Sequence, residues 1–210
     1  MERVLLTVIP SLSEAQRNLI REAALSRGFT PYFFDTPREA APVAEEAEII
    51  FSISPQLTRG AKKLKWMCSP FAGVDPFLVP GAFEVPGALL TNSSGAYGTT
   101  ISEHIVMTAL MLLRRQTEYT EVIRDRGWRR DLPIRSLRDS RITLLGTGDI
   151  GRETALRLRG FLPASLTGIN RRGEAPEGVF DRVLTVEELD RVLPETDLLI
   201  MSLSATPATE

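Results

Sequence analysis

One feature constrains the fold of this chain more than any other: a glycine pattern placed between a strand pattern and a helix pattern. Residues 141–145 (Arg-Ile-Thr-Leu-Leu) are typical of a buried strand, and Gly146-Thr-Gly148-Asp-Ile-Gly151 follows directly. An amphipathic helix pattern begins at the last of these glycines. A strand, the spacing GxGxxG and a helix, in this order, are typical of a βαβ unit that binds a dinucleotide. The chain is therefore expected to contain a parallel sheet with helices on its faces.

Each glycine of the pattern has its own predicted task. Gly146 makes the tight turn, Gly148 lets the backbone approach a pyrophosphate, and Gly151 lets the helix pack against the strand. The backbone N–H groups of Asp149 and Ile150 are expected to face the phosphates at the start of the helix. The alternative is a glycine-rich turn without a ligand, but the residues that follow favour a binding site.

The next strand pattern ends at Asn170, 24 residues after the first glycine. An NAD site normally carries Asp or Glu at this point, against the ribose 2′-hydroxyl. Here the uncharged Asn170 is followed by Arg171 and Arg172. A carboxylate would repel a 2′-phosphate, whereas two guanidinium groups would bind it. The sequence therefore favours NADP over NAD as the cofactor, and the alternative is a solvated turn that ends at Gly173.

Short apolar runs alternate with helical patterns along the rest of the chain, which is typical of the α/β class. An apolar helix over residues 99–115 has so little polar surface that we expect it to be buried between domains or subunits, through Val106, Leu110 and Leu113. Strands are predicted at residues 4–9, 30–34, 49–53, 64–68, 89–91, 141–145, 165–169 and 198–203, and short helices at 38–46, 58–63 and 186–193.

Composition excludes several classes of protein. Apolar residues make up 43% of the chain and charged residues 25%, which is ordinary globular composition. A net charge of −2 gives no global field for nucleic acid or an anionic membrane, so neither is expected as a partner. The arginine-rich stretch 124–141 is interleaved with aspartate and favours a solvated connector over a nucleic-acid patch. A single cysteine, Cys68, suits a reducing cytoplasm, and a single histidine, His104, excludes a two-histidine metal site.

Ordered segments along the whole chain resemble the D-isomer-specific 2-hydroxyacid dehydrogenases, a family that includes phosphoglycerate dehydrogenases and glyoxylate/hydroxypyruvate reductases. Residues 71–75 (Phe-Ala-Gly-Val-Asp) are similar to the family's loop ending in Gly-Val-Asp. Residues 92–104 resemble the segment that crosses from the substrate domain into the cofactor domain. Residues 146–151 match the cofactor fingerprint, and residues 197–209 resemble the third strand with its Thr-Pro-x-Thr exit.

The resemblance implies a flavodoxin-like substrate domain, residues 1–97, followed by the first half of a Rossmann doubly wound parallel sheet, residues 98–210. In the family, backbone N–H groups of the Gly-Val-Asp loop bind the substrate carboxylate, which corresponds to Ala72 and Gly73 here. Leu203 and Ser204 occupy the position that flanks the adenosine, although many relatives carry proline in place of Ser204.

The resemblance also implies that the catalytic groups lie elsewhere. Family members use an arginine, a glutamate and a histidine that follow the third cofactor-domain strand, so no catalytic residue is predicted within these 210 residues, and the chain is expected to be the front part of a longer protein. His104 does not replace the missing histidine. It is a neighbour of Glu103 on a helix, and such neighbours point to different faces, so we interpret it as a packing or interface residue.

The leading hypothesis is an NAD(P)-dependent oxidoreductase of the cytoplasm that acts on the CH–OH group of a D-2-hydroxy acid and reduces the 2-oxo acid. Its partners would be a small 2-oxo or 2-hydroxy acid and a second copy of the chain, in a homodimer. The 210-residue chain alone is expected to be inactive. One alternative is a non-catalytic, dinucleotide-sensing module like the corepressors of the same family, and another is a decayed gene product without activity.

Overall fold

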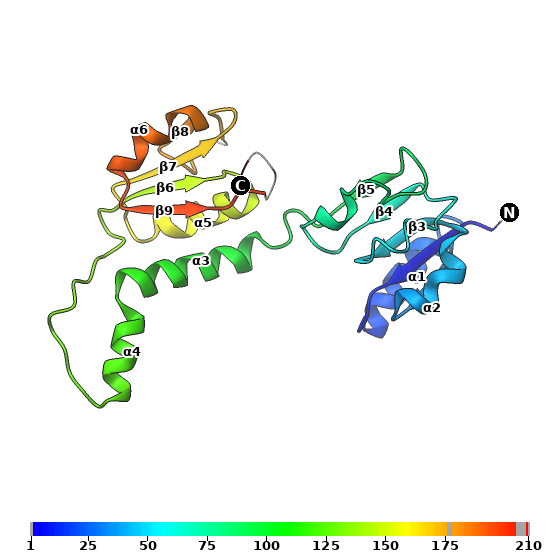
Figure 1. Ribbon diagram of the computed structural model, residues 1–210, viewed down its shortest axis with the longest axis horizontal. Coiled ribbons are helices and arrows are strands. Elements are labelled where there is room, and N and C mark those ends of the chain that lie inside the picture. Colours follow the sequence, from blue (N-terminus) through cyan, green and yellow to red (C-terminus); the bar gives the residue numbers. More distant parts are fainter. Residues whose placement is uncertain (1, 176–177, 205–208, 210) are drawn as a thin grey trace. The chain divides into compact units, whose positions relative to one another are not determined.

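The computed structural model describes residues 2–175, 178–204 and 209. The chain divides into two compact units, Met1–Ser94 and Gly95–Glu210, and most of their helices and strands are labelled in Figure 1. The division lies three residues before the predicted one. None of the helices in the described ranges combines the length and apolar character that a membrane crossing requires.

The first unit is built on a parallel sheet with strand order β2-β1-β3-β4-β5. This is the order of flavodoxin-like folds and confirms the predicted class. Its strands are β1 (Val4–Val8), β2 (Thr30–Phe34), β3 (Ala47–Ser52), β4 (Trp66–Cys68) and β5 (Leu89–Thr91). Its helices are α1 (Glu14–Leu25), α2 (Pro37–Ala44) and the short 3-10 turn η1 (Asp75–Phe77).

Local sequence explains where the first helix of this unit begins and ends. Ser13 caps α1 because its Oγ accepts from the N–H of Gln16, while the Gln16 side chain accepts from the N–H of Ser13 at 2.9 Å. Gly28 then takes a positive φ of 74° and turns the chain toward β2. The centre of the sheet is fully buried, with Leu6, Ile50 and Met67 at 0% exposure. The unit therefore has a core of its own.

The second unit carries a parallel sheet with strand order β8-β7-β6-β9. Its strands are β6 (Arg141–Leu145), β7 (Ser165–Asn170), β8 (Arg182–Thr185) and β9 (Leu198–Met201). Its helices are α3 (Gly98–Leu113), α4 (Gln116–Arg124), α5 (Asp149–Arg159) and α6 (Leu189–Val192), and 3-10 turns η2 (Val186–Glu188) and η3 (Leu193–Glu195) flank α6. This order corresponds to strands 3-2-1-4 of a Rossmann sheet, which confirms the predicted fold class.

The predicted set of elements needs three corrections. The sequence suggested three strands in this sheet, but β8 is a further edge strand that pairs only with β7 among the described residues. Residues 58–63 form turns, not a helix, and α4 was not predicted. β8 is four residues long and α4 exposes most of its side chains. Such short elements give only a weak local signal for prediction.

The helix α3 presents its apolar residues to two different surroundings. Val106, Leu110 and Leu113 are partly buried against the core of their own unit, and their part in a subunit interface stays a prediction. Met107, Met111 and Leu112 are instead 49%, 41% and 67% exposed. We call these three side chains the outer face of α3. They add to the apolar surface of the helix, whose groove is also lined by Val106 and Leu110.

Candidate functional site

The carboxyl ends of β6, β7 and β9 lie at one edge of the second sheet, because the strands are parallel and adjacent. The loop after β6 is tied to the end of β9. Ser202 N–H donates to the carbonyl of Leu145 at 2.9 Å, and Ser202 Oγ donates to the carbonyl of Gly146 at 3.3 Å. The chain reverses its strand order between β6 and β9, so this edge is the topological switch point at which open α/β sheets bind ligands.

Two glycines of the fingerprint are required by the chain's own packing. Gly146 has a φ of +105°, and a Cβ added to it would lie 2.6 Å from the carbonyl oxygen of Ser202. A Cβ added to Gly151 would overlap the carbonyl of Gly146. Any side chain at these positions would push the start of α5 away from β6 and β9. These two glycines therefore explain the tight loop but say nothing about a ligand.

Gly148 differs from the other two. It is exposed and has an ordinary φ of −71°, and apart from its chain neighbours no described atom lies within 4 Å of an added Cβ. It also caps α5 without any side-chain hydrogen bond from the described residues, so the first N–H groups of the helix keep their capacity to bind an anion. Open space beside a helix start fits a pyrophosphate, and the fold does not itself need glycine here.

Asn170 shapes the turn that follows β7. Its amide nitrogen donates to Thr147 Oγ1 at 2.6 Å and to the carbonyl of Glu174 at 2.7 Å. Its Oδ1 accepts from the N–H groups of Arg172 and Gly173, both at 2.8 Å. The predicted cofactor residue thus holds the turn and joins it to the fingerprint loop. Thr147 escaped prediction because its partner lies 23 residues away in the sequence.

Arg171 and Arg172 extend from this turn and are exposed. Neither guanidinium group forms an ion pair with a described residue. They follow the carboxyl end of β7, next to the strand that precedes the fingerprint. The two positive charges are therefore available to an anion at the same sheet edge as Gly148.

The segment after β9 reaches the same edge. Leu203, which is 40% exposed, and the exposed Ser204 directly follow Ser202, the residue hydrogen-bonded to the fingerprint loop. Ser204 is held from the C-terminal side, because its carbonyl accepts from Thr209 Oγ1 at 2.7 Å. The predicted Thr-Pro-x-Thr exit lies largely outside the described residues, since 205–208 are not among them.

In the first unit, the predicted substrate loop lies beyond the carboxyl end of β4. Ala72 and Gly73 are both exposed. Asn92 Nδ2 donates to the carbonyl of Ala72 at 2.6 Å, and the N–H of Ser93 donates to the carbonyl of Phe71 at 3.1 Å. The residues after β5 therefore fasten the loop in place and leave its tip to solvent, as a loop that binds a small anion requires.

The start of α3 contributes no acid–base pair. His104 is exposed, which contradicts its interpretation as a packing residue within the unit. Its neighbour Glu103 pairs with Arg157 of α5 at 3.9 Å. Thr100 Oγ1 donates to the carbonyl of Tyr97 within the first turn at 3.2 Å. The described residues also hold no cluster of three His, Cys, Asp or Glu side chains that could bind a metal ion.

An ion pair fixes the opposite edge of this sheet. Asp197, just before β9, accepts from the N–H of Arg141 at 2.8 Å and from its Nε at 3.1 Å. The hydrogen bond from the Arg141 side chain, followed by that from its backbone, lowers the pKa of the Asp197 carboxyl. β6 and β9 are thereby held in register, so that Gly146 and Ser202 meet at the carboxyl edge.

Comparison with known proteins identifies the family. Residues 106–210, half of the chain, match the family model described as the NAD binding domain of D-isomer specific 2-hydroxyacid dehydrogenases. The chain belongs to this family. A D-lactate dehydrogenase of Treponema pallidum is 32% identical over 149 residues, which are 70% of this chain and 44% of that protein.

Solved members of the family share the fold over the whole chain. A D-isomer specific 2-hydroxyacid dehydrogenase family protein from Aeromonas salmonicida is 29% identical, with a TM-score of 0.82 over 100% of this chain and 66% of its own. An NADPH-dependent glyoxylate/hydroxypyruvate reductase from Sinorhizobium meliloti, solved with NADP and sulfate, is 26% identical, with a TM-score of 0.74 over 100% and 64%. The chain thus spans somewhat under two thirds of the length of these relatives.

Proposed function

We propose that the chain provides the cofactor site and the substrate-carboxylate loop of an NAD(P)-dependent D-2-hydroxyacid dehydrogenase, which reduces a 2-oxo acid. The observation that carries the proposal is the space at Gly148. Of the three fingerprint glycines, it is the one that the packing of the chain does not require. It lies at the start of α5, where no side-chain hydrogen bond from the described residues caps the helix. A pyrophosphate is the ligand that this combination fits.

The cofactor, when bound, supplies a hydride from its nicotinamide, and the residues of this chain bind and orient it. The N–H groups of Asp149 and Ile150 bind the phosphates, and Gly148 leaves room for them. Leu203 and Ser204 flank the adenosine. On the first unit, the N–H groups of Ala72 and Gly73 bind the substrate carboxylate.

The cofactor is NADP in preference to NAD. The exposed Arg171 and Arg172 bind the 2′-phosphate, and Asn170 holds their turn without adding the carboxylate that would repel it. The Sinorhizobium meliloti reductase was solved with NADP, which supports the same preference here.

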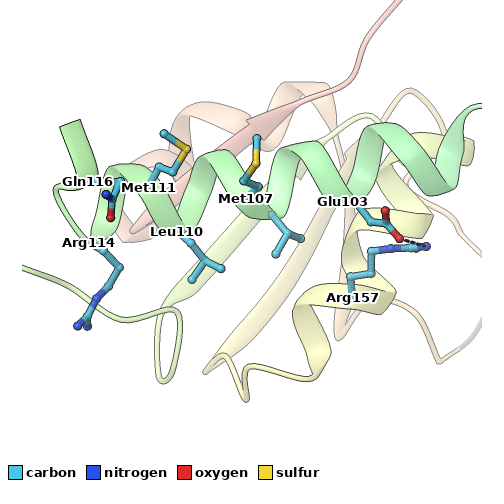
Figure 2. A pocket seen from close by; sticks show the side chains of 8 residues that line it. Glu103, Met107, Leu110, Met111, Arg114, Gln116 and Arg157 are labelled. Carbon is cyan, nitrogen blue, oxygen red and sulfur yellow. Dashed lines mark ion pairs between the residues drawn. The ribbon is translucent and has the colours of Figure 1, made fainter. Parts of the chain in front are cut away.

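We further propose that two copies of the chain pair through the outer face of α3. The groove beside this helix has an apolar middle formed by Val106, Met107, Leu110 and Met111. Figure 2 shows it, with Glu103 paired with Arg157 at one end and Arg114 at the other. An antiparallel pair of identical helices would bury both apolar faces and bring Glu103 close to Arg114 of the partner subunit. A second copy of the chain is therefore the occupant that best fits the apolar middle of the groove.

The proposal is tested by calorimetric titration of the 210-residue chain with NADPH. We expect saturable binding of one NADPH per chain, with an affinity that falls as salt is raised, because phosphate contacts contribute to it. A chain that is folded by circular dichroism and yet gives no heat of binding at millimolar NADPH would contradict the proposal.

A further inference from the structure

A close contact joins the start of α3 to the start of α5. Gly98 is buried, and a Cβ added to it would lie 2.8 Å from Cγ and 2.9 Å from Oδ1 of Asp149, and closer still to Oδ2. The carboxylate thus lies directly against the backbone of Gly98. Gly98 does not have a positive φ, so its backbone conformation is open to any residue. The Asp149 carboxylate is the neighbour that would have to move if residue 98 carried a side chain.

The contact matters because of where Asp149 lies. It is the first residue of α5 and directly follows Gly148, so its backbone N–H belongs to the proposed phosphate site. The side-chain carboxylate of this residue therefore puts a negative charge beside the site proposed for the negatively charged pyrophosphate. Like charges within about 4–6 Å strongly oppose each other. A fingerprint with aspartate here can bind a dinucleotide well only if the side chain is directed elsewhere.

Gly98 provides that other place. It begins the 16-residue helix α3, and the first turn of a helix is the end that favours a negative group. α3 packs along α5, so the carboxylate lies where both helices begin. An added methyl group at residue 98 would occupy the volume that the carboxylate now fills. The side chain of Asp149 would then have to turn out toward the edge at Gly148.

We propose that Gly98 is a positioning residue for the cofactor: it receives the Asp149 carboxylate and so keeps this negative charge away from the pyrophosphate. The inference rests on the proposed dinucleotide binding and adds a determinant outside the fingerprint, 48 residues before its first glycine. It predicts that residues 98 and 149 are energetically coupled in cofactor binding, and that this coupling depends on the size and charge of the side chain at 149.

The test is a double-mutant cycle read out by NADPH titration. Gly98→Ala should weaken NADPH binding by about tenfold, since a displaced unit charge beside the pyrophosphate at an effective dielectric constant of about 20 is worth at least that factor. Asp149→Ala should tighten binding severalfold. In the Asp149→Ala background, Gly98→Ala should then change the affinity by less than about twofold.

Controls separate this role from a structural one. Gly160→Ala, at the end of α5, is the matched glycine variant, because its added Cβ would meet only an ordinary contact at 3.5 Å, and it should leave NADPH affinity unchanged. If Gly98→Ala acted only through steric overlap with the side chain at 149, it would weaken binding equally in an Asp149→Asn background, where the size is kept and the charge is removed. Either that result or a Gly98→Ala protein with parental affinity would overturn the inference. A parent chain that binds no NADPH would instead refute the proposed function, and the inference with it.

Discussion

The cofactor preference is the prediction with the most direct chemical basis. Arg171 and Arg172 are exposed, and their turn is held by Asn170 through backbone N–H groups, not through the arginine side chains. Replacing both arginines with alanine should therefore remove two positive charges and leave the turn intact. A hydrogen bond to a charged group contributes roughly 1.5–3 kcal/mol. A single such bond from either arginine to the 2′-phosphate therefore corresponds to about a tenfold difference in affinity.

We accordingly expect NADPH to bind at least about tenfold more tightly than NADH, and Arg171→Ala plus Arg172→Ala to remove most of this difference by weakening NADPH alone. The assay is a fluorescence titration of the reduced cofactors at fixed ionic strength. Arg27→Ala plus Arg38→Ala, in the first unit, removes the same charge and should leave the ratio unchanged. Equal affinities for NADPH and NADH in the parent protein would refute the reasoning, as would a ratio that survives in the double variant.

Three further outcomes are expected. The 210-residue chain should bind cofactor without oxidising it in the presence of glyoxylate or hydroxypyruvate; turnover at the reduced-nicotinamide absorbance band that is lost in His104→Ala would show that this histidine is the acid–base group. Met111→Glu should convert a dimer into a monomer in light scattering, and a parent that is monomeric at high concentration would contradict the proposed pairing. The pKa of Asp197 is lowered in the folded chain, so its ionised carboxylate stabilises the fold at pH values above its unfolded pKa of about 3.9. This stabilisation is lost as the pH falls through the lower pKa of the folded chain. In urea unfolding, Asp197→Asn should therefore be less stable than the parent at pH 7 and approach it below about pH 3, whereas a pH-independent difference would exclude this linkage.

Local patterns predicted the parts of the fold that depend on neighbours in sequence. The structure has β5 and β6 at the predicted 89–91 and 141–145, because each is an apolar run with clear turn residues around it. The start of α5 follows from the glycine spacing in the same way. These are the elements that bring Gly146 and Gly148 to the sheet edge, so the main part of the site was accessible to sequence reasoning.

The features that escaped prediction depend on contacts between distant segments. β8 is a strand because it pairs with β7, and its own residues carry little signal. The apolar pattern of α3 predicted a helix with little polar surface but could not tell which of its residues pack against their own unit, as Val106 does, and which stay exposed, as Met107 does. The contact of Gly98 with Asp149 joins residues 51 positions apart, and no spacing rule connects them.

The central claim, that the loop after β6 binds a dinucleotide, is tested most directly at Gly148. Valine fits its φ of −71°, and apart from the chain neighbours no described atom lies within 4 Å of the added Cβ. The thermal unfolding temperature of Gly148→Val should therefore stay close to that of the parent, apart from a small loss at the helix cap. Calorimetric titration of this variant with NADPH should show binding weakened by at least about tenfold, because the side chain fills the place of the pyrophosphate. A folded Gly148→Val protein that binds NADPH as tightly as the parent would contradict the claim and reduce the fingerprint to a turn.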